Sequence, residues 1–221
     1  MPTLNSVTGA KHARIYSVGS YRPKRIVTNA EVCELIDSTD EWIRERSGIT
    51  ERRWAGESES VVFMAAEAAK IAIARAKISP SEIGLIMVGT VSHPYAFPSA
   101  SVEVGELIGA RGAPAFDFAA ACAGFCYGVG MAADIIRGGS AKYILVIGVE
   151  RLTDVVNKHD RGTSFIFADG AGAVVIGPAD TPGIGPIVWG GDGSQKDAIT
   201  MTASLNDFRN GIYPDYPTAV M

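Results

Sequence analysis

Residues 116–125 read Phe116-Asp117-Phe118-Ala119-Ala120-Ala121-Cys122-Ala123-Gly124-Phe125. This stretch predicts a short apolar strand, a tight turn of small residues and then the start of a helix. Apolar side chains continue beyond it at helical spacing, and small or apolar residues also fill the remaining faces. A helix that is apolar all round is typical of a protein interior. We therefore expect a buried helix that ends at Gly138-Gly139.

This predicted helix start makes Cys122 a candidate nucleophile. The first N–H groups of a helix lack partners and carry partial positive charge. Their field favours the thiolate, which is the nucleophilic form of cysteine. The alternative is a small, buried apolar role, which free cysteines often have. The pattern favours the reactive role for Cys122 and the buried role for Cys33 and Cys126.

Strand and helix patterns alternate along most of the chain. The expected strands lie at residues 13–20, 49–54, 83–91, 115–119, 143–149, 165–176 (with a glycine turn) and from 187 to 191. The expected helices other than the Cys122 helix lie at residues 28–36, 39–47, 58–76 and 99–107. This alternation predicts right-handed βαβ units and a mostly parallel sheet with helices on its faces. Catalytic groups in such sheets gather at the carboxyl ends of strands, and Cys122 directly follows one.

Two short N-terminal helices carry capping signals. Thr28 with Glu31, and Ser38 with Glu41, have the capping-box spacing, and Gly48 ends the second helix. Trp42 lies four residues before Arg46, so both share one face of that second helix. An indole beside a guanidinium can hold a nucleotide base and its phosphates. The residues alone favour the alternative, a solvated charged helix with its indole packed against the protein.

Composition narrows the class of protein. The formal net charge of −4 gives no support for nucleic-acid binding. Three cysteines without metal-like spacing fit a reducing compartment, and we expect no bound metal. Neither a membrane-spanning stretch nor an apolar N-terminal leader is evident, so we expect a cytoplasmic protein without a membrane partner.

Six stretches resemble one known family. They are Val18-Gly19-Ser20-Tyr21-Arg22-Pro23, Asp40-Glu41-Trp42-Ile43, Arg46-Ser47-Gly48-Ile49, Ala119-Ala120-Ala121-Cys122-Ala123-Gly124-Phe125, Asp160-Arg161-Gly162-Thr163 and Ala168-Asp169-Gly170-Ala171-Gly172-Ala173. In this order, they resemble the N-terminal part of a β-ketoacyl-acyl-carrier-protein synthase III, a member of the thiolase-like superfamily. The resemblance covers about residues 13 to 200. The six motifs together are highly specific for this family, although each motif alone is a weak indication.

The resemblance implies a fold and a reaction. The fold would be α/β and thiolase-like. The reaction would transfer a short acyl group from acyl-CoA to Cys122 and then condense it with malonyl-acyl-carrier protein, releasing carbon dioxide. The N–H of Cys122 would be one oxyanion donor. Acyl-CoA would be a substrate, and no cofactor is implied.

The resemblance also implies roles for other residues. Trp42 and Arg161 match the pair that holds the CoA adenine, which reverses the preference stated for Trp42 above. Ser38 and Arg46 match positions around the CoA nucleotide. Phe97 matches a residue that a partner subunit places against the acyl pocket. The strand before Cys122 matches the strand that pairs across the family's homodimer.

The family completes its site with a histidine and an asparagine from the second half of the fold. None of His12, His93 and His159 matches that histidine, and we expect His93 and His159 to be ordinary loop residues. We therefore expect a polar lead over residues 1–12, an N-terminal thiolase-like half over 13–178, and a connector with an incomplete second half over 179–221. On this basis, the 221 residues are expected to be inactive alone.

Two alternatives stay open. One is an acyltransferase of the same fold that uses the same cysteine with a different acceptor. The other is a non-catalytic subunit that binds CoA or a partner chain. Both keep the same fold prediction, and they differ in what Cys122 does.

Overall fold

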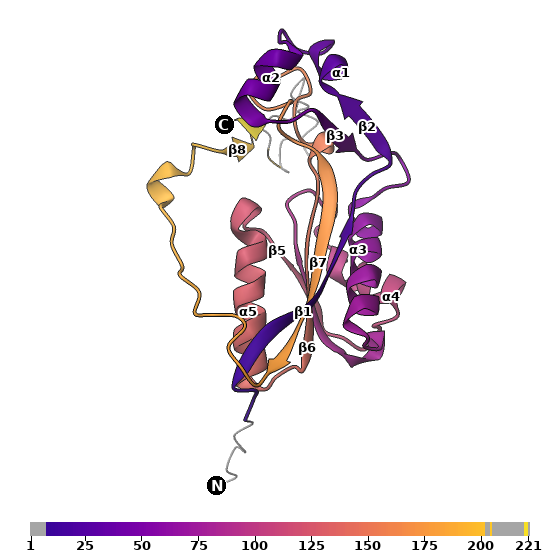
Figure 1. Cartoon of the computed structure of the whole chain (residues 1–221), viewed down its shortest axis with the longest axis vertical. Coiled ribbons are helices and arrows are strands. Elements are labelled where there is room, and N and C mark those ends of the chain that lie inside the picture. Colours follow the sequence, from indigo (N-terminus) through magenta and orange to yellow (C-terminus); the bar gives the residue numbers. More distant parts are fainter. Residues whose placement is uncertain (1–7, 202–203, 205–218, 221) are drawn as a thin grey trace. The chain divides into compact units, whose positions relative to one another are not determined.

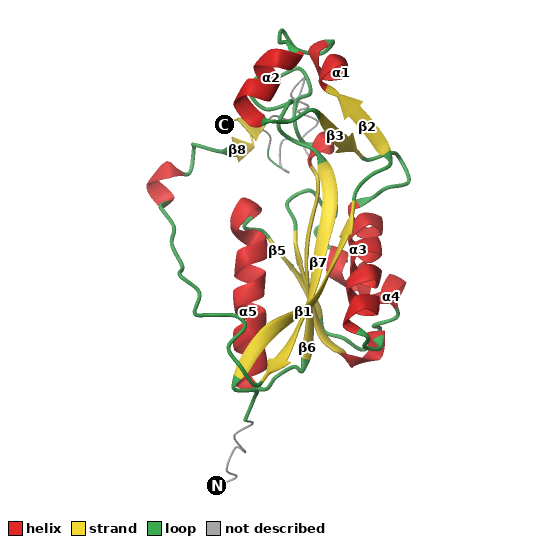
Figure 2. Cartoon of the chain, viewed as in Figure 1, coloured by secondary structure: helices red, strands yellow, loops and turns green. Residues whose placement is uncertain are grey.

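The computed structural model describes residues 8–201, 204 and 219–220. These residues divide into two compact units, each described below by itself (Figures 1 and 2). The sheet unit comprises Met1–Arg22, Glu59–Glu150 and Gly170–Val188. The second unit comprises Pro23–Ser58, Arg151–Asp169 and Trp189–Met221. Parts of the expected N-terminal lead and of the expected connector, residues 1–7, 202–203, 205–218 and 221, lie outside the described residues.

A mixed five-stranded sheet organises the sheet unit. Its strands are β1 (His12–Tyr21), β4 (Ile83–Gly89), β5 (Ala115–Phe118), β6 (Tyr143–Arg151) and β7 (Asp169–Ala179). Their order is β1-β7-β6-β4-β5. Both β5 and β6 run parallel to β4, as the alternating pattern predicts, whereas β1 pairs antiparallel with β7. The expected α/β class is confirmed, with β5 at one edge of the described sheet.

Helices cover both faces of this sheet. The helices α3 (Val61–Ala76) and α4 (Ala100–Ile108) lie on one face, and α5 (Gly124–Gly138) lies on the other (Figure 1). Small residues let α3 lie very close to β1. Its buried stripe is largely alanine, and the Ser17 hydroxyl donates to the Ala72 carbonyl oxygen at 2.6 Å. This close packing explains why the stripe contains so few large side chains.

The helix α5 is not buried all round, so that expectation is wrong for the described chain. Its small residues face the sheet and are buried, with Gly128, Ala132 and Ile136 among them. Phe125 is 38% exposed, and Cys126 is also exposed. Most residues of α5 are small or apolar, as expected. Composition alone, however, does not indicate which of several apolar faces of a helix packs against the sheet.

Two expected strand segments are also wrong, whereas the segment expected over residues 169–176 is present in β7. Residues 165–167 form a turn and a short irregular segment, and β7 begins only at Asp169. The side chain of Phe165 is buried in an apolar cluster of the second unit, which explains its hydrophobic neighbourhood without a strand. Residues 187–191 are irregular as well. There, Ile187 packs against α5 at Gly130, where an added Cβ would come within 2.4 Å of it.

Short elements build the second unit. They are β2 (Arg25–Thr28), α1 (Asn29–Cys33), α2 (Asp40–Ser47), β3 (Glu51–Trp54), β8 (Thr200–Met201) and β9 (Ala219–Val220). β2 pairs antiparallel with β3, and β8 pairs antiparallel with β9. Single turns of 3-10 helix occur at Leu152–Asp154 and Gly193–Gln195 in this unit and at Pro80–Glu82 in the sheet unit.

The helix caps of the second unit follow the sequence signals with one exception. The capping box of Thr28 and Glu31 is present, and Gly48 ends α2 in the left-handed region at φ 70°. The cap of α2 is Thr39, whose hydroxyl accepts from the Trp42 N–H at 3.1 Å, so the expected Ser38 cap is wrong. Ser38 and Thr39 are both good capping residues, and the backbone path selects between them.

The approach of β1 to α3 gives a stability prediction. An added Cβ at Gly19 would lie 2.1 Å from the Ala68 carbonyl oxygen, which is helix backbone and cannot yield locally. We expect Gly19→Ala to lower the free energy of unfolding by about 3 kcal/mol, the upper end of ordinary overpacking. Urea unfolding measures this change. Gly172→Ala is the control on the neighbouring strand, because nothing lies within 4 Å of its added Cβ. Equal effects of the two substitutions would contradict the prediction.

Candidate active site

A strained turn places Cys122 between β5 and α5. Ala121 adopts φ 44°, the left-handed region, which costs an L-residue about 1–2 kcal/mol. Residues Ala121–Ala123 form a 3-10 turn, closed by a bond from the Ala123 N–H to the Ala120 carbonyl oxygen at 3.1 Å. Backbone strain of this kind collects at functional sites. The result is an exposed Cys122 just beyond the carboxyl end of β5.

The N-terminus of α5 is electrostatically open. No side chain caps it, whereas α1, α2 and α3 are capped by Thr28, Thr39 and Ser60. The Ala123 and Gly124 N–H groups donate to the Ala120 and Ala121 carbonyl oxygens, so an anion at Cys122 would be stabilised by the field of the helix N-terminus. Cys122 precedes the first residue of α5 by two positions. The sequence predicts a thiol at the N-terminus of a helix. In the structure, this thiol lies on the 3-10 turn that leads into α5.

A glycine lets α5 reach the carboxyl ends of the strands. An added Cβ at Gly128 would lie 2.7 Å from Cγ1 of Val146 on β6 and 2.9 Å from Cζ of Phe118 on β5. Any larger residue at this position would push α5 away from both strands. The turn that carries Cys122 would move with it.

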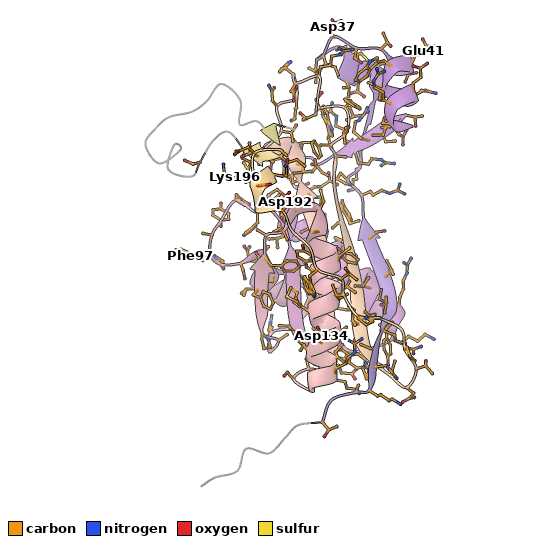
Figure 3. All side chains as sticks on the ribbon, turned by 90° about the vertical axis from the view of Figure 1, so that its left-hand side faces the viewer. Asp37, Glu41, Phe97, Asp134, Asp192 and Lys196 are labelled. Atoms are coloured by element: carbon orange, nitrogen blue, oxygen red, sulfur yellow. The ribbon has the colours of Figure 1, made fainter. Side chains whose placement is uncertain are left out.

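Phe97 lies on the loop of residues 91–98, which is called the 91–98 loop below. Its side chain is 85% exposed, and Figure 3 shows it at the outer end of the loop. The peptide bond from Phe97 to Pro98 is cis. A hollow of about 330 Å³ lies beside the loop, lined by Thr90, His93, Tyr95, Ala96, Ser99 and residues 115–119. The exposed ring is therefore available to a ligand or to another chain.

The second unit brings Trp42, Arg46 and Arg161 together. The guanidinium carbon of Arg46 lies 4.3 Å from the Trp42 ring centroid, and that of Arg161 lies 4.5 Å from it. The ring of Phe165 meets the Trp42 ring edge-on, with centroids 5.2 Å apart. We call Trp42, Arg46 and Arg161 the tryptophan cluster. An indole with two cations is suited to a base that carries phosphate groups.

A buried polar network holds the helix of the tryptophan cluster. Asn29 donates to Asp40 at 2.7 Å and to the Ile49 carbonyl oxygen at 2.8 Å, at opposite ends of α2. The buried Arg52 in turn donates to the Asn29 side-chain oxygen at 2.7 Å. Hydrogen bonds from Asn29 and Arg44 hold the pKa of Asp40 below its usual value. These contacts fix the helix that presents Trp42.

Arg161 and Ser38 both lie in loops of the second unit. Asp160 accepts from the Gly162 N–H at 2.9 Å and from the Thr163 hydroxyl at 2.5 Å, which closes the turn around Arg161. The Ser38 hydroxyl is buried, and among the described residues it has no hydrogen-bond partner. A ligand oxygen or nitrogen could satisfy it.

Two partly buried carboxylates escaped the sequence reasoning. Glu150 is the penultimate residue of β6, and Asp117 lies between two phenylalanines on β5. A charged residue within an apolar strand could have identified both, because such a residue is withdrawn from water only where it has partners. Within the described part of the chain, no three His, Cys, Asp or Glu side chains are grouped to hold a metal ion. No helix there is long and apolar enough to span a membrane.

The comparisons with known proteins agree with this geometry. Residues 116–193 match the family described as 3-Oxoacyl-[acyl-carrier-protein (ACP)] synthase III. The Beta-ketoacyl-[acyl-carrier-protein] synthase III of Streptomyces glaucescens is 46% identical over 98% of this chain and 65% of its own length. The synthase III 1 of Streptomyces coelicolor is 48% identical over 98% of this chain and 63% of its own length.

A solved structure extends the likeness to the fold. The priming β-ketosynthase from the R1128 polyketide biosynthetic pathway matches with a TM-score of 0.94 and 42% identity, covering 100% of this chain and 66% of that one. The fold is therefore thiolase-like. These matches confirm the resemblance to 3-oxoacyl-acyl-carrier-protein synthase III enzymes that the motifs show. The chain spans 65% and 63% of the lengths of the two Streptomyces relatives.

The two exposed thiols of the sheet unit allow a direct test of the helix effect. Cys122 and Cys126 are both exposed, but only Cys122 precedes the uncapped start of α5. We expect limiting iodoacetamide to label Cys122 first, because the helix N-terminus favours its thiolate. Peptide mapping by mass spectrometry measures the order. Faster labelling of Cys126 would contradict the assignment, and Cys33, which is partly buried, serves as the slow reference.

Proposed function

We propose that the protein is a β-ketoacyl-acyl-carrier-protein synthase III that starts fatty acid synthesis. The observation that supports this most is the exposed Cys122 on a strained turn, before an uncapped helix, in a chain that resembles this family. The thiolate attacks the acyl carbonyl carbon of acyl-CoA, the bond from that carbon to the CoA sulfur breaks, and CoA leaves as its thiolate. The product of this first step is an acyl thioester on Cys122.

The second step joins this acyl group to malonyl-acyl-carrier protein. The malonyl thioester loses carbon dioxide, and the electron pair of the broken bond forms an enolate. The enolate carbon attacks the acyl carbonyl carbon, and the Cys122 thiolate leaves, which gives a 3-oxoacyl thioester. Negative charge develops on carbonyl oxygens in both steps, and N–H groups around the turn at Cys122 are suited to stabilise it.

In this proposal, the tryptophan cluster binds the CoA nucleotide. The adenine stacks on the Trp42 indole after the Arg161 guanidinium, which lies 4.5 Å from the ring centroid in this structure, moves outward to cover its other face. Arg46 attracts the phosphates. The unpartnered Ser38 hydroxyl supplies a further polar contact. Because acyl-CoA is itself a substrate, the chemistry needs no cofactor.

We also propose that the protein is a homodimer in the cytoplasm. β5 lies at the edge of the described sheet, and its Phe116 is 40% exposed, so this edge can pair with a second copy. The exposed Phe97 then limits the length of the acyl chain in the partner's site. Three free thiols fit a reducing compartment.

An acylation experiment tests the proposed function. Because residues 1–221 alone are expected to be inactive, the test uses a protein that also contains the second half of the fold. We expect it to gain the mass of one acetyl group when incubated with acetyl-CoA, and to lose it with formation of a 3-oxoacyl product when malonyl-acyl-carrier protein follows. Cys122→Ala should abolish both steps, and the matched control Cys126→Ala should keep them. An acyl-enzyme that ignores the malonyl substrate would indicate a different acceptor. Absence of any acyl-enzyme would overturn the proposal in favour of a non-catalytic subunit.

A second experiment tests the CoA site. Stacking on an aromatic ring contributes about 1–3 kcal/mol per base, so Trp42→Ala should weaken CoA binding roughly tenfold. Isothermal titration calorimetry measures the Kd for CoA, and the KM for malonyl-acyl-carrier protein should stay unchanged. Trp189→Ala, which removes an exposed indole of the same unit, is the control. A Kd that Trp42→Ala leaves unchanged would show that this side chain has only a structural role.

A further inference from the structure

Glu150 holds the start of the 91–98 loop. Its carboxylate accepts from the Val91 N–H at 2.9 Å, from the Ser92 hydroxyl at 2.5 Å and from the Thr90 hydroxyl at 3.4 Å. Burial raises the pKa of this carboxyl above its usual value, and the hydrogen bonds from these residues oppose that rise. Partial burial of a carboxylate is costly unless partners compensate it, and here the compensating groups all belong to one short segment.

Asp117 holds the other end of the same loop. Its two carboxylate oxygens accept from the Ala100 N–H at 2.7 Å and the Ser101 N–H at 2.8 Å. These are the first N–H groups of α4, and Ser99, the cap residue of α4, makes no capping hydrogen bond of its own. Asp117 therefore caps α4 from a neighbouring strand, and the loop is anchored at both ends by carboxylates from the sheet.

The loop between these anchors is polar inside and aromatic outside. The His93 side chain is only 6% exposed, and its Nε2 lies 3.3 Å from the Pro98 carbonyl oxygen, which closes the loop across its base. The rings at the tip point the other way, with Tyr95 at 65% and Phe97 at 85% exposure. Most surface loops do the reverse, burying apolar groups and exposing polar ones. This loop is therefore built to present an aromatic ring in a fixed place.

We propose that Glu150 and Asp117 are positioning residues, which hold the 91–98 loop so that Phe97 limits the length of the acyl chain accepted by the enzyme. The inference rests on the proposed function, in which Phe97 meets the acyl chain. The inference adds that selectivity for acyl-chain length depends on Glu150 and Asp117 as well as on the ring of Phe97. A ring on a loosened loop can move aside for a longer chain, while a fixed ring cannot.

The test compares the specificity constants for two substrates, and their ratio does not change when part of the protein unfolds. The ratio is kcat/KM for octanoyl-CoA over kcat/KM for acetyl-CoA, measured with a protein that also contains the second half of the fold and with its variants. Glu150→Leu keeps the volume but removes the acceptors, so we expect the ratio to rise at least fivefold. Glu150→Gln should stay within twofold of the parent, because its amide oxygen can accept from Val91 and its NH2 group can donate to a turned Ser92 hydroxyl.

If Glu150→Leu does not fold, two further variants still test the anchoring role. Ser92→Ala removes a single donor and should raise the ratio about twofold, and Asp117→Asn should also raise it. Asp169→Asn is the matched control, because Asp169 is a buried carboxylate that accepts from Ala55 and Thr153 in the second unit. It should lower stability and leave the ratio unchanged.

Phe97→Thr separates failure of this inference from failure of the proposed function. If Phe97→Thr raises the ratio while the Glu150, Ser92 and Asp117 variants do not, the anchoring role is overturned and the acyl-chain role of Phe97 stands. If Phe97→Thr leaves the ratio unchanged, both of these roles are overturned. The acyl-enzyme on Cys122 is measured independently, so the proposed condensing activity survives either result.

Discussion

The close packing of α5 against the sheet is the constraint on which the sheet unit depends. Gly128 lies where a single added carbon would meet both Val146 and Phe118, so only a residue without a side chain lets the helix lie this close to the two strands. That contact fixes the start of α5, and the start of α5 fixes the turn that carries Cys122. The strain at Ala121 is sustained by this packing, because a loosely held turn would relax to an ordinary conformation.

In both units, polar side chains withdrawn from water hold a segment that carries an aromatic ring. In the second unit, Arg52 and Asn29 are buried and hydrogen-bonded, and together they fix the helix that carries Trp42. In the sheet unit, Glu150 and Asp117 fix the loop that carries Phe97. In each case, buried or partly buried polar side chains bond to backbone groups of a segment that presents an aromatic ring. Unpaired burial of these groups would be costly, so the segment has one stable conformation.

Features that depend on neighbouring residues in the chain were predicted better than features that depend on distant packing partners. Most local signals were confirmed: the capping box at Thr28, the left-handed end of α2 at Gly48 and the strand before Cys122 are all present, whereas the cap of α2 is Thr39 instead of the expected Ser38. Signals that depend on packing partners were not. The apolar run around Phe165 is part of a core cluster instead of a strand, and the apolar faces of α5 did not reveal which one packs on the sheet.

The sequence by itself indicated most strands and helices of the sheet unit, the resemblance to one family and the candidate nucleophile, because these depend on residue types at short spacing. Only the tertiary structure showed that Arg46 and Arg161, which are far apart in the chain, meet the same indole. It also showed that Glu150 and Asp117 bond to the two ends of one loop. The physical reason is that a hydrogen bond or a ring contact depends on a few ångströms of separation in space. Distance along the chain does not fix that separation, and the packing of strands and helices does.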